Sequence, residues 1–294
     1  FIAEMDYGLA PCIQEAIDNA CDHCKLGYIP EPWKQRVAAA CAGWQRSHYG
    51  WDVDPSIIRV VPDVLEAYEI FLRELVGAGN SVIVPTPAYM PFLSVPKLYD
   101  VDVIEIEMLQ SGDAETGEAQ WVFDFDAIEC AFAAGCHAFV LCNPHNPIGK
   151  VLTLEEELRL SDLAAQYDVR IFNDEIHAPF VFEGKHIPFP TISEQAALQS
   201  MTATSASKSF NIPGTKCAQV LLTNPADRDM WAVKAEWSEH QTATIGAIAT
   251  TTAYNEGDLW FQDAFAYVCR NLALFDEQMR ERFAGVGYIK PQGT

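Results

Sequence analysis

Basic residues are scarce in this chain. Lysine and arginine together number 19, against 41 aspartates and glutamates, so the formal net charge is −22. Such a surface repels nucleic acid and anionic membranes, and neither is an expected partner. The acidic residues are spread along the chain and form no acidic tail, which indicates a solvated acidic surface.

Long apolar runs and a secretory signal pattern are also missing. No uncharged apolar run reaches the length needed to span a bilayer, and the N-terminus lacks a basic region followed by an apolar one. The nine cysteines are odd in number and irregularly spaced, and several lie in apolar runs such as residues 138–142. That pattern is typical of reduced thiols in a cytosolic protein, so we expect a cytoplasmic location.

A metal site is not expected. Residues 21–24 (Cys-Asp-His-Cys) resemble half of a zinc site, but no second pair follows at the spacing of a zinc ribbon.

The remaining composition is that of an ordinary globular protein with room for more than one domain, since 49% of the 294 residues are hydrophobic. The chain starts at Phe1 and stops at Thr294, in what resembles the approach to a further strand. We therefore expect a fragment.

The first part of the chain has helical spacing. Residues 11–48 are predicted to be helical with a break at 27–32, and four apolar residues at helical spacing are expected to face one core: Trp33, Val37, Cys41 and Trp44. Asp63 and Glu66 have the spacing of a capping box, which predicts a helix from Val64 to about Gly77.

Strands and helices then alternate. Short apolar runs predict strands at residues 81–84, 101–106, 138–142, 169–172, 200–204 and 217–222, with a helix capped by Thr153 among them. Continuous apolar strands between helices indicate a mostly parallel sheet covered on both faces. Residues 231–283 have a helical pattern again.

Chemically useful side chains follow four of these strands. In an open α/β sheet, ligands bind beyond the carboxyl ends of the strands, where this sequence has Tyr89, Asn146, Asp174 and Lys208. Taken singly, each has an ordinary structural explanation as a core ring, a turn residue, a helix cap or a surface charge. An aromatic ring, an amide, a carboxylate and an amine together suit pyridoxal phosphate (PLP). Lys208 also lies among Ser205, Ser207 and Ser209, with Lys216 eight positions on.

Three motifs resemble those of fold-type I PLP enzymes of the class I/II aminotransferase superfamily. They are Asn-Pro-His-Asn-Pro-x-Gly at 143–149, Asp-Glu-Ile-His at 174–177, and the lysine segment from Ser205 to Gly214. Residues 2–7, 27–28 and 49–51 resemble the cystathionine β-lyase (C–S lyase) branch. The resemblance implies a three-layer α/β/α large domain with a mostly parallel mixed sheet. It also implies an N-terminal helical segment at 1–48, a PLP-binding domain at 49–258 and the start of a largely missing C-terminal small domain at 259–294.

The resemblance also implies roles for particular residues. Lys208 would be the catalytic Schiff-base lysine, Asp174 would pair with the pyridine nitrogen, and Asn146 would bond the phenolic oxygen. The other implied cofactor contacts are Tyr89 stacked on the ring, His177 beside it, and Val64, Leu65, Ser205, Ser207 and Lys216 around the phosphate. Tyr28 would reach the phosphate of a neighbouring subunit, so a homodimer with shared active sites is expected.

Two departures from the family pattern stand out. Asp63 occupies a position where the family often has glycine, and we expect its side chain to cap the helix and turn away from the phosphate. In the family, the arginine that clamps the substrate carboxylate normally lies in the C-terminal domain, beyond the expected end of this fragment, so no residue of this chain is assigned that role. The predicted function is a C–S β-lyase acting on cystathionine or a related β-thio amino acid. The alternatives are an amino acid aminotransferase and a non-catalytic PLP-binding regulatory protein.

Overall fold

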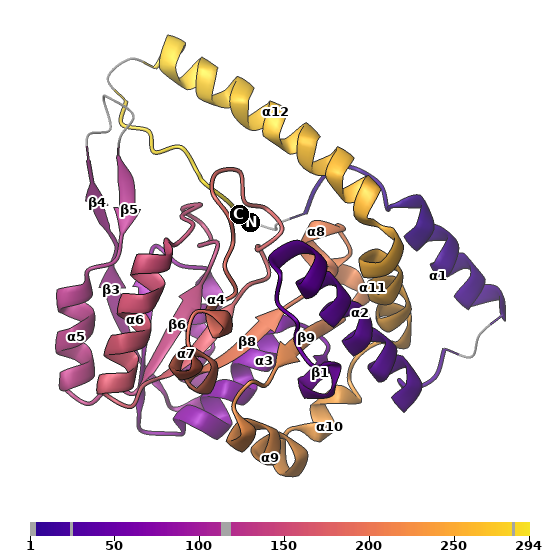
Figure 1. The fold of residues 1–294 in the computed structure, drawn as a ribbon, viewed down its shortest axis with the longest axis horizontal. Coiled ribbons are helices and arrows are strands. Elements are labelled where there is room, and N and C mark those ends of the chain that lie inside the picture. Colours follow the sequence, from indigo (N-terminus) through magenta and orange to yellow (C-terminus); the bar gives the residue numbers. More distant parts are fainter. Residues whose placement is uncertain (1–3, 24–25, 113–118, 284–285) are drawn as a thin grey trace.

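A seven-stranded sheet runs through the part of the molecule that the structure describes (Figure 1). The structure, a computed structural model, describes residues 4–23, 26–112, 119–283 and 286–294. The strands follow the order β1-β9-β8-β7-β6-β2-β3. Their bounds are β1 Ile58–Val61, β2 Ser81–Thr86, β3 Asp102–Glu107, β6 Ala138–Cys142, β7 Arg170–Asp174, β8 Ser200–Thr204 and β9 Ala218–Leu221. A separate hairpin pairs β4 (Leu109–Ser111) with β5 (Gln120–Val122).

The sheet is mixed but mostly parallel, as the sequence predicts. Strand β9 pairs antiparallel with both β1 and β8, whereas the other pairings are parallel. The register places Cys142 opposite Asp174, and Asp174 opposite Ala203. The carboxyl ends of β6, β7 and β8 therefore meet at one edge, where the residues after each strand come together.

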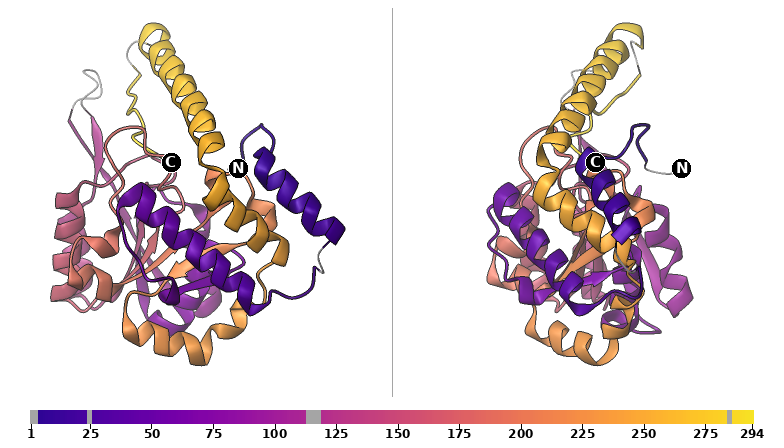
Figure 2. Two further views of the ribbon diagram at one scale, coloured as in Figure 1. Left: turned by 45° about the vertical axis from the view of Figure 1, so that its right-hand side comes forward. Right: turned by 90° about the vertical axis from the view of Figure 1, so that its right-hand side faces the viewer.

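Helices cover both faces of the sheet (Figures 1 and 2). The longer ones are α1 Pro11–His23, α2 Glu31–Tyr49, α3 Val64–Phe71, α5 Phe125–Ala133, α6 Leu154–Gln166, α9 Pro225–Lys234, α11 Thr244–Glu256 and α12 Asp258–Arg282. Shorter ones are α4 Met90–Ser94, α7 Glu194–Gln199, α8 Ala206–Ser209 and α10 Glu236–Glu239. A π-helical turn, Leu72–Val76, continues α3 to Gly77, where the sequence predicts its end.

Alternating side chains divide the core between the two faces. Val82 and Val84 pack with α3 and with Trp231 of α9, while Ile83 between them packs with α5 and α6 on the opposite face. A further cluster joins α2, α11 and the start of α12 next to Ile58 and Leu221. This arrangement is the expected three-layer α/β/α architecture.

The packing of α2 corrects one expectation. Cys41 and Trp44 belong to the cluster shared with α11 and α12, but Val37 and Trp33 pack in a second, smaller cluster with Ile29 and Val60. Helical spacing places residues on one face, but α2 is 19 residues long and crosses two neighbouring packing groups along that face.

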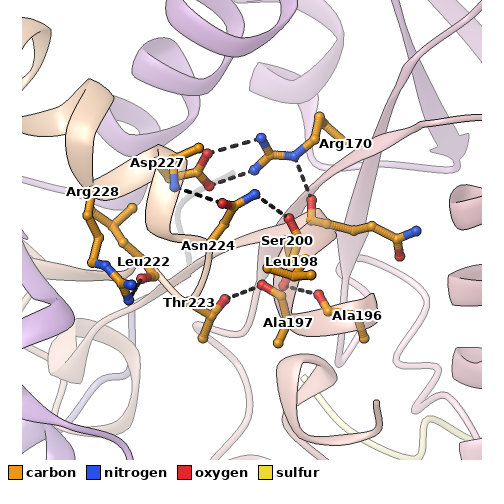
Figure 3. A network of polar contacts seen from close by, with 12 residues as sticks. Arg170, Ala196, Ala197, Leu198, Ser200, Leu222, Thr223, Asn224, Asp227 and Arg228 are labelled. Carbon is orange, nitrogen blue, oxygen red and sulfur yellow. Dashed lines mark hydrogen bonds and ion pairs between the residues drawn. The ribbon is translucent and has the colours of Figure 1, made fainter. Parts of the chain in front are cut away.

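An ion-pair network fastens the edge of the sheet at which the parallel strands begin (Figure 3). Arg170, the first residue of β7, donates two hydrogen bonds to the buried Asp227 of α9, at 3.0 and 2.5 Å, and a third to the carbonyl of Gln199. Asn224 caps α9 and donates to the carbonyl of Leu198 at 2.6 Å. The network ties α9 to the α7–β8 turn and leaves the opposite edge for the site.

Helix α12 projects away from the sheet, and residues 286–294 return to it (Figure 2). The amides of Gln292 and Gly293 donate to the carbonyl of Gly149 at 2.7 and 2.9 Å. The helical pattern expected up to residue 283 is confirmed by α12, which runs from Asp258 to Arg282. The division into segments 1–48, 49–258 and 259–294 stays a prediction.

The described residues also bear on the expectations about cysteines and metals. Each cysteine in this part of the chain is an unpaired thiol, and Cys41, Cys136, Cys142 and Cys217 are buried. Cys24 of the half zinc site lies outside the described residues, and those that are described hold no cluster of three or more metal-binding side chains. None of the described helices combines the length and the apolar character that crossing a membrane requires.

Candidate active site

The residues predicted from strand ends gather at one edge of the sheet. Asp174 ends β7, Asn146 follows β6, Tyr89 follows β2 and Lys208 lies in α8 after β8. Because β9 is antiparallel, Lys216 precedes it at this same edge. The topology therefore brings together side chains that lie far apart in the sequence.

Asp174 is a buried carboxylate at the centre of this group. Its Oδ1 atom accepts a hydrogen bond from the amide of Ile176 at 3.0 Å. Burial raises its pKa to about 7, with a further increase from Glu175, while the Ile176 amide and Lys208 oppose the shift. A carboxylate in this position is stabilised by a neighbouring cation, and a protonated pyridine nitrogen is such a cation.

Lys208 interacts electrostatically with both Asp174 and His177. Burial lowers the pKa of Lys208, against the attraction of Asp174 and Glu4. Burial also lowers the pKa of His177 to about 4, and the charge of Lys208 adds to that effect. The imidazole is therefore neutral near pH 7. Its Nδ1 atom is buried with no hydrogen-bond partner among the described residues, which leaves it available to a ligand.

Asn211 fixes the N-terminal segment close to Lys208, a role that strand-end reasoning missed. Its side chain accepts from the amide of Met5 at 2.9 Å and donates to the carbonyls of Met5 and Tyr7 at 2.8 and 3.1 Å. Asn211 has a φ of 55°, a left-handed conformation that asparagine tolerates better than most residues. The Asn within the lysine motif was the available signal, but its partners lie more than 200 residues away.

The loops that carry Tyr89 and Asn146 are held together by His145. Its Nε2 atom donates to the carbonyl of Pro87 at 2.9 Å, and its backbone pairs with Lys150. Tyr89 is partly exposed and packs edge-on against Phe92 at a centroid distance of 5.6 Å. Burial raises the pKa of Tyr89, and the charges of Asp174 and Asp63 raise it further, so the ring lies within electrostatic reach of both carboxylates.

The expected phosphate end of the site has its own polar contacts. Val64 and Leu65 begin α3, so their amides have no partner within the helix. Ser205 Oγ donates to the carbonyl of Cys217 at 2.9 Å and accepts from the amide of Ser207 at 3.0 Å. Asp63 caps α3 as expected. Its other oxygen, however, does not turn away, because it accepts from Lys216 Nζ at 2.8 Å.

Two buried acids, Glu157 and Glu175, pair with asparagines behind the site, and no sequence pattern predicts this pairing. Asn143 donates to Glu157 Oε1 at 2.7 Å, and Asn173 donates to Glu175 Oε1 at 2.7 Å. Burial and the charge of Glu175 raise the pKa of Glu157 to about 9. The two asparagines thus anchor the ends of β6 and β7 to neighbouring acids.

Tyr28, expected to reach a neighbouring subunit, lies apart from these groups on the surface and is 90% exposed. Thr244 Oγ1 holds the adjacent turn by donating to the carbonyl of Gly27 at 2.7 Å.

The comparison with known proteins agrees with this geometry. The chain belongs to the aminotransferase class I and II family, which it matches over residues 5–294. It is 35% identical to a cystathionine β-lyase of Corynebacterium glutamicum and 27% identical to the cystathionine β-lyase PatB of Bacillus subtilis. In both cases the match covers 100% of this chain, with 76% and 75% of the relatives. Cystalysin from Treponema denticola, whose crystal structure contains PLP, is 26% identical with a TM-score of 0.91, over 100% of this chain and 73% of that one.

The fold is therefore that of fold-type I PLP enzymes, and the family and its PLP-containing neighbour imply PLP as cofactor. The side chains present suit that group. A buried carboxylate of raised pKa matches a pyridinium, the unpartnered Nδ1 of His177 matches a ring substituent, and a lysine of lowered pKa matches an aldehyde. Cationic Lys216 beside the start of α3 matches a phosphate.

Proposed function

We propose that this protein is a PLP-dependent C–S β-lyase that converts cystathionine or a related β-thio amino acid to a thiol, pyruvate and ammonia. The observation that carries the proposal is that Asp174 and His177 both lie within electrostatic reach of Lys208 at the sheet edge. Similarity to cystathionine β-lyases over the full length of the chain supports the choice of reaction.

Lys208 has two roles in this proposal. Its amine would bond the cofactor aldehyde and, once displaced by the substrate amine, remove the proton from the substrate α-carbon. The lowered pKa of Lys208 increases the fraction of neutral amine that can act as a base near pH 7. When bound, PLP supplies an electron sink for the negative charge that develops at that carbon.

The other residues would position the cofactor. Asp174 would face the pyridine nitrogen and keep it protonated, which shifts the carboxyl's own pKa downward by mutual attraction. Asn146 and the neutral His177 would bond ring substituents, and Tyr89 would stack on the ring. Val64, Leu65, Ser205, Ser207 and Lys216 would surround the phosphate.

A homodimer belongs to the same proposal, with Tyr28 of each subunit completing the other's phosphate site. A cytoplasmic location also belongs to it, because the unpaired thiols are typical of a reducing compartment.

An aminotransferase is the second candidate, favoured by the family to which the chain belongs. Proton removal from the α-carbon is common to both reactions, which differ in whether a β-thiolate then leaves or a proton returns to the cofactor. The groups that surround Lys208 serve either course.

Product analysis separates the two reactions. The protein loaded with PLP is incubated with cystathionine, with and without an added keto acid. Release of thiol and pyruvate without the keto acid is the expected result, and strict dependence on the keto acid would establish the aminotransferase instead.

A pair of lysine variants ties the reaction to the site. Lys208→Ala is expected to abolish both product release and the visible absorption of the lysine-bound cofactor. Lys97→Ala, which removes an exposed lysine outside the site, is expected to preserve both. A Lys208→Ala protein that keeps the visible band would contradict the assignment.

A further inference from the structure

Asp63 and Lys216 are brought together by the pairing of β1 with β9. Val61, the last residue of β1, lies opposite Ala218, the first residue of β9. Asp63 follows Val61 by two residues and Lys216 precedes Ala218 by two. The antiparallel register therefore places both residues beyond the same end of the strand pair, where Lys216 Nζ lies 2.8 Å from Asp63 Oδ2.

The carboxylate of Asp63 makes two contacts of the kind that a phosphate makes. Its Oδ1 accepts from the amide of Glu66 in the first turn of α3 at 2.9 Å, and its Oδ2 accepts from the ammonium of Lys216. Amides at a helix N-terminus and a lysine ammonium are common ligands of bound phosphate groups. Burial raises the pKa of Tyr89, the charges of Asp174 and Asp63 raise it further, and the charge of Lys216 lowers it. The ion pair therefore faces the candidate site.

We propose that Asp63 competes with the cofactor phosphate for Lys216 and thereby lowers the affinity of the protein for PLP. This inference rests on the proposed PLP-binding function. To bind Lys216, a phosphate must displace or share the carboxylate, and in either case it meets a negative charge at close range. The opposite outcome, in which Asp63 improves affinity by holding Lys216 in place, predicts the reverse effect of removing the charge.

Asp63→Asn tests the competition without removing the helix cap. Asparagine is as good an N-cap as aspartate, since its side-chain oxygen can still accept from the Glu66 amide. Asp54→Asn is the matched control, because Asp54 also caps a helical turn, with Oδ1 accepting from the amide of Ser56 at 2.8 Å, but lies before β1, at the opposite end of that strand. Asp63→Ser supplies a second uncharged cap should Asp63→Asn fail to fold.

The measurement is a titration of each cofactor-free protein with PLP and, separately, with pyridoxal, followed by the visible absorption of the lysine-bound form. Pyridoxal has the aldehyde but no phosphate, so competition between Asp63 and the phosphate for Lys216 does not affect its binding. We expect Asp63→Asn to bind PLP roughly threefold to tenfold more tightly than wild type, as one partly exposed charge contact predicts. Its affinity for pyridoxal should match wild type, and Asp54→Asn should match wild type with both compounds.

The outcomes distinguish this inference from the proposed function. A wild-type protein that gives no visible band with PLP overturns both. A wild-type band together with unchanged or weaker PLP binding by Asp63→Asn overturns the competition alone. An equal gain for PLP and pyridoxal also overturns it, because the effect would then not act through the phosphate.

Discussion

Glu157, on α6 behind the candidate site, shows how burial controls ionisation at the scale of a single residue. Its Oε1 accepts from Asn143, while its Oε2 is buried without a partner among the described residues. Burial raises its pKa from 4.5 to about 9. Between those values the folded carboxyl keeps a proton that the unfolded one has lost. Its contribution to stability therefore falls as pH rises from about 5 to 9.

Glu157→Gln should remove this loss. We expect the difference in unfolding free energy, variant minus wild type, to increase by roughly 2–4 kcal/mol as the pH rises from 5 to 9. Denaturant unfolding of both proteins at pH 5 and pH 9 measures this change. Asp174, whose pKa is also raised, adds the same pH dependence to both proteins, so its effect cancels in the difference. Glu155→Gln, on the exposed side of the same turn, should show no such trend. A pH-independent difference for Glu157→Gln would mean that Glu157 is ionised throughout.

Some residue-level features are predictable from sequence and others are not. Thr153 and Glu156 form the complete capping box that their spacing indicates, because a cap depends on residues three positions apart. The Asp63 cap was predicted for the same reason. Its second contact, with Lys216, was not, because it joins residues 153 positions apart through a strand register that the sequence does not specify.

Elements were predictable where their patterns are long or their strands buried. Strands β6 and β8 have the predicted bounds, since both are buried along their whole length. No sequence pattern predicts strand β1, which is mostly buried but has only four residues, one of them Arg59. The β4–β5 hairpin is not predicted either, and its strands have three residues each and are largely exposed. Short exposed strands carry little hydrophobic signal, so their pairing depends on contacts formed in the fold.

Gly149 joins the loop after β6 to the returning segment 286–294, and it needs to be glycine for two reasons. Its φ is 68°, and a Cβ atom there would meet Pro291 Cβ at 2.4 Å and the carbonyl of Gly293 at 2.8 Å. Gly149→Ala is expected to cost roughly 2–4 kcal/mol of unfolding free energy and to speed amide exchange in residues 289–294. Denaturant unfolding and hydrogen exchange measure the two effects.

Gly50→Ala is the control for backbone strain alone. Gly50 has a similar φ of 72°, but a Cβ atom there would meet nothing within 4 Å. We expect this variant to lose about 1 kcal/mol, with exchange in residues 289–294 unchanged. Equal losses for the two variants would show that the returning segment moves aside without strain.

The predicted homodimer concerns the whole molecule, because each active site would then take residues from two subunits. Tyr28 is 90% exposed, so its side chain takes no part in a buried site of its own subunit. If it completes the phosphate site of a partner, Tyr28→Phe should weaken PLP binding although Lys208 is intact. Lys208→Ala should prevent covalent binding although Tyr28 is intact.

Co-expression of Tyr28→Phe with Lys208→Ala tests the shared site through the fraction of sites that bind PLP tightly. A mixed dimer has one site with both native residues and one site with neither. With random pairing, about a quarter of all sites should then bind PLP with wild-type affinity, although neither variant alone has such a site. A PLP titration followed by visible absorption resolves this fraction of tightly binding sites. The Tyr28→Phe protein expressed alone gives the baseline of weakly binding sites. If the mixture shows only the weak binding of Tyr28→Phe, each subunit builds its site alone, and the shared-site dimer is wrong.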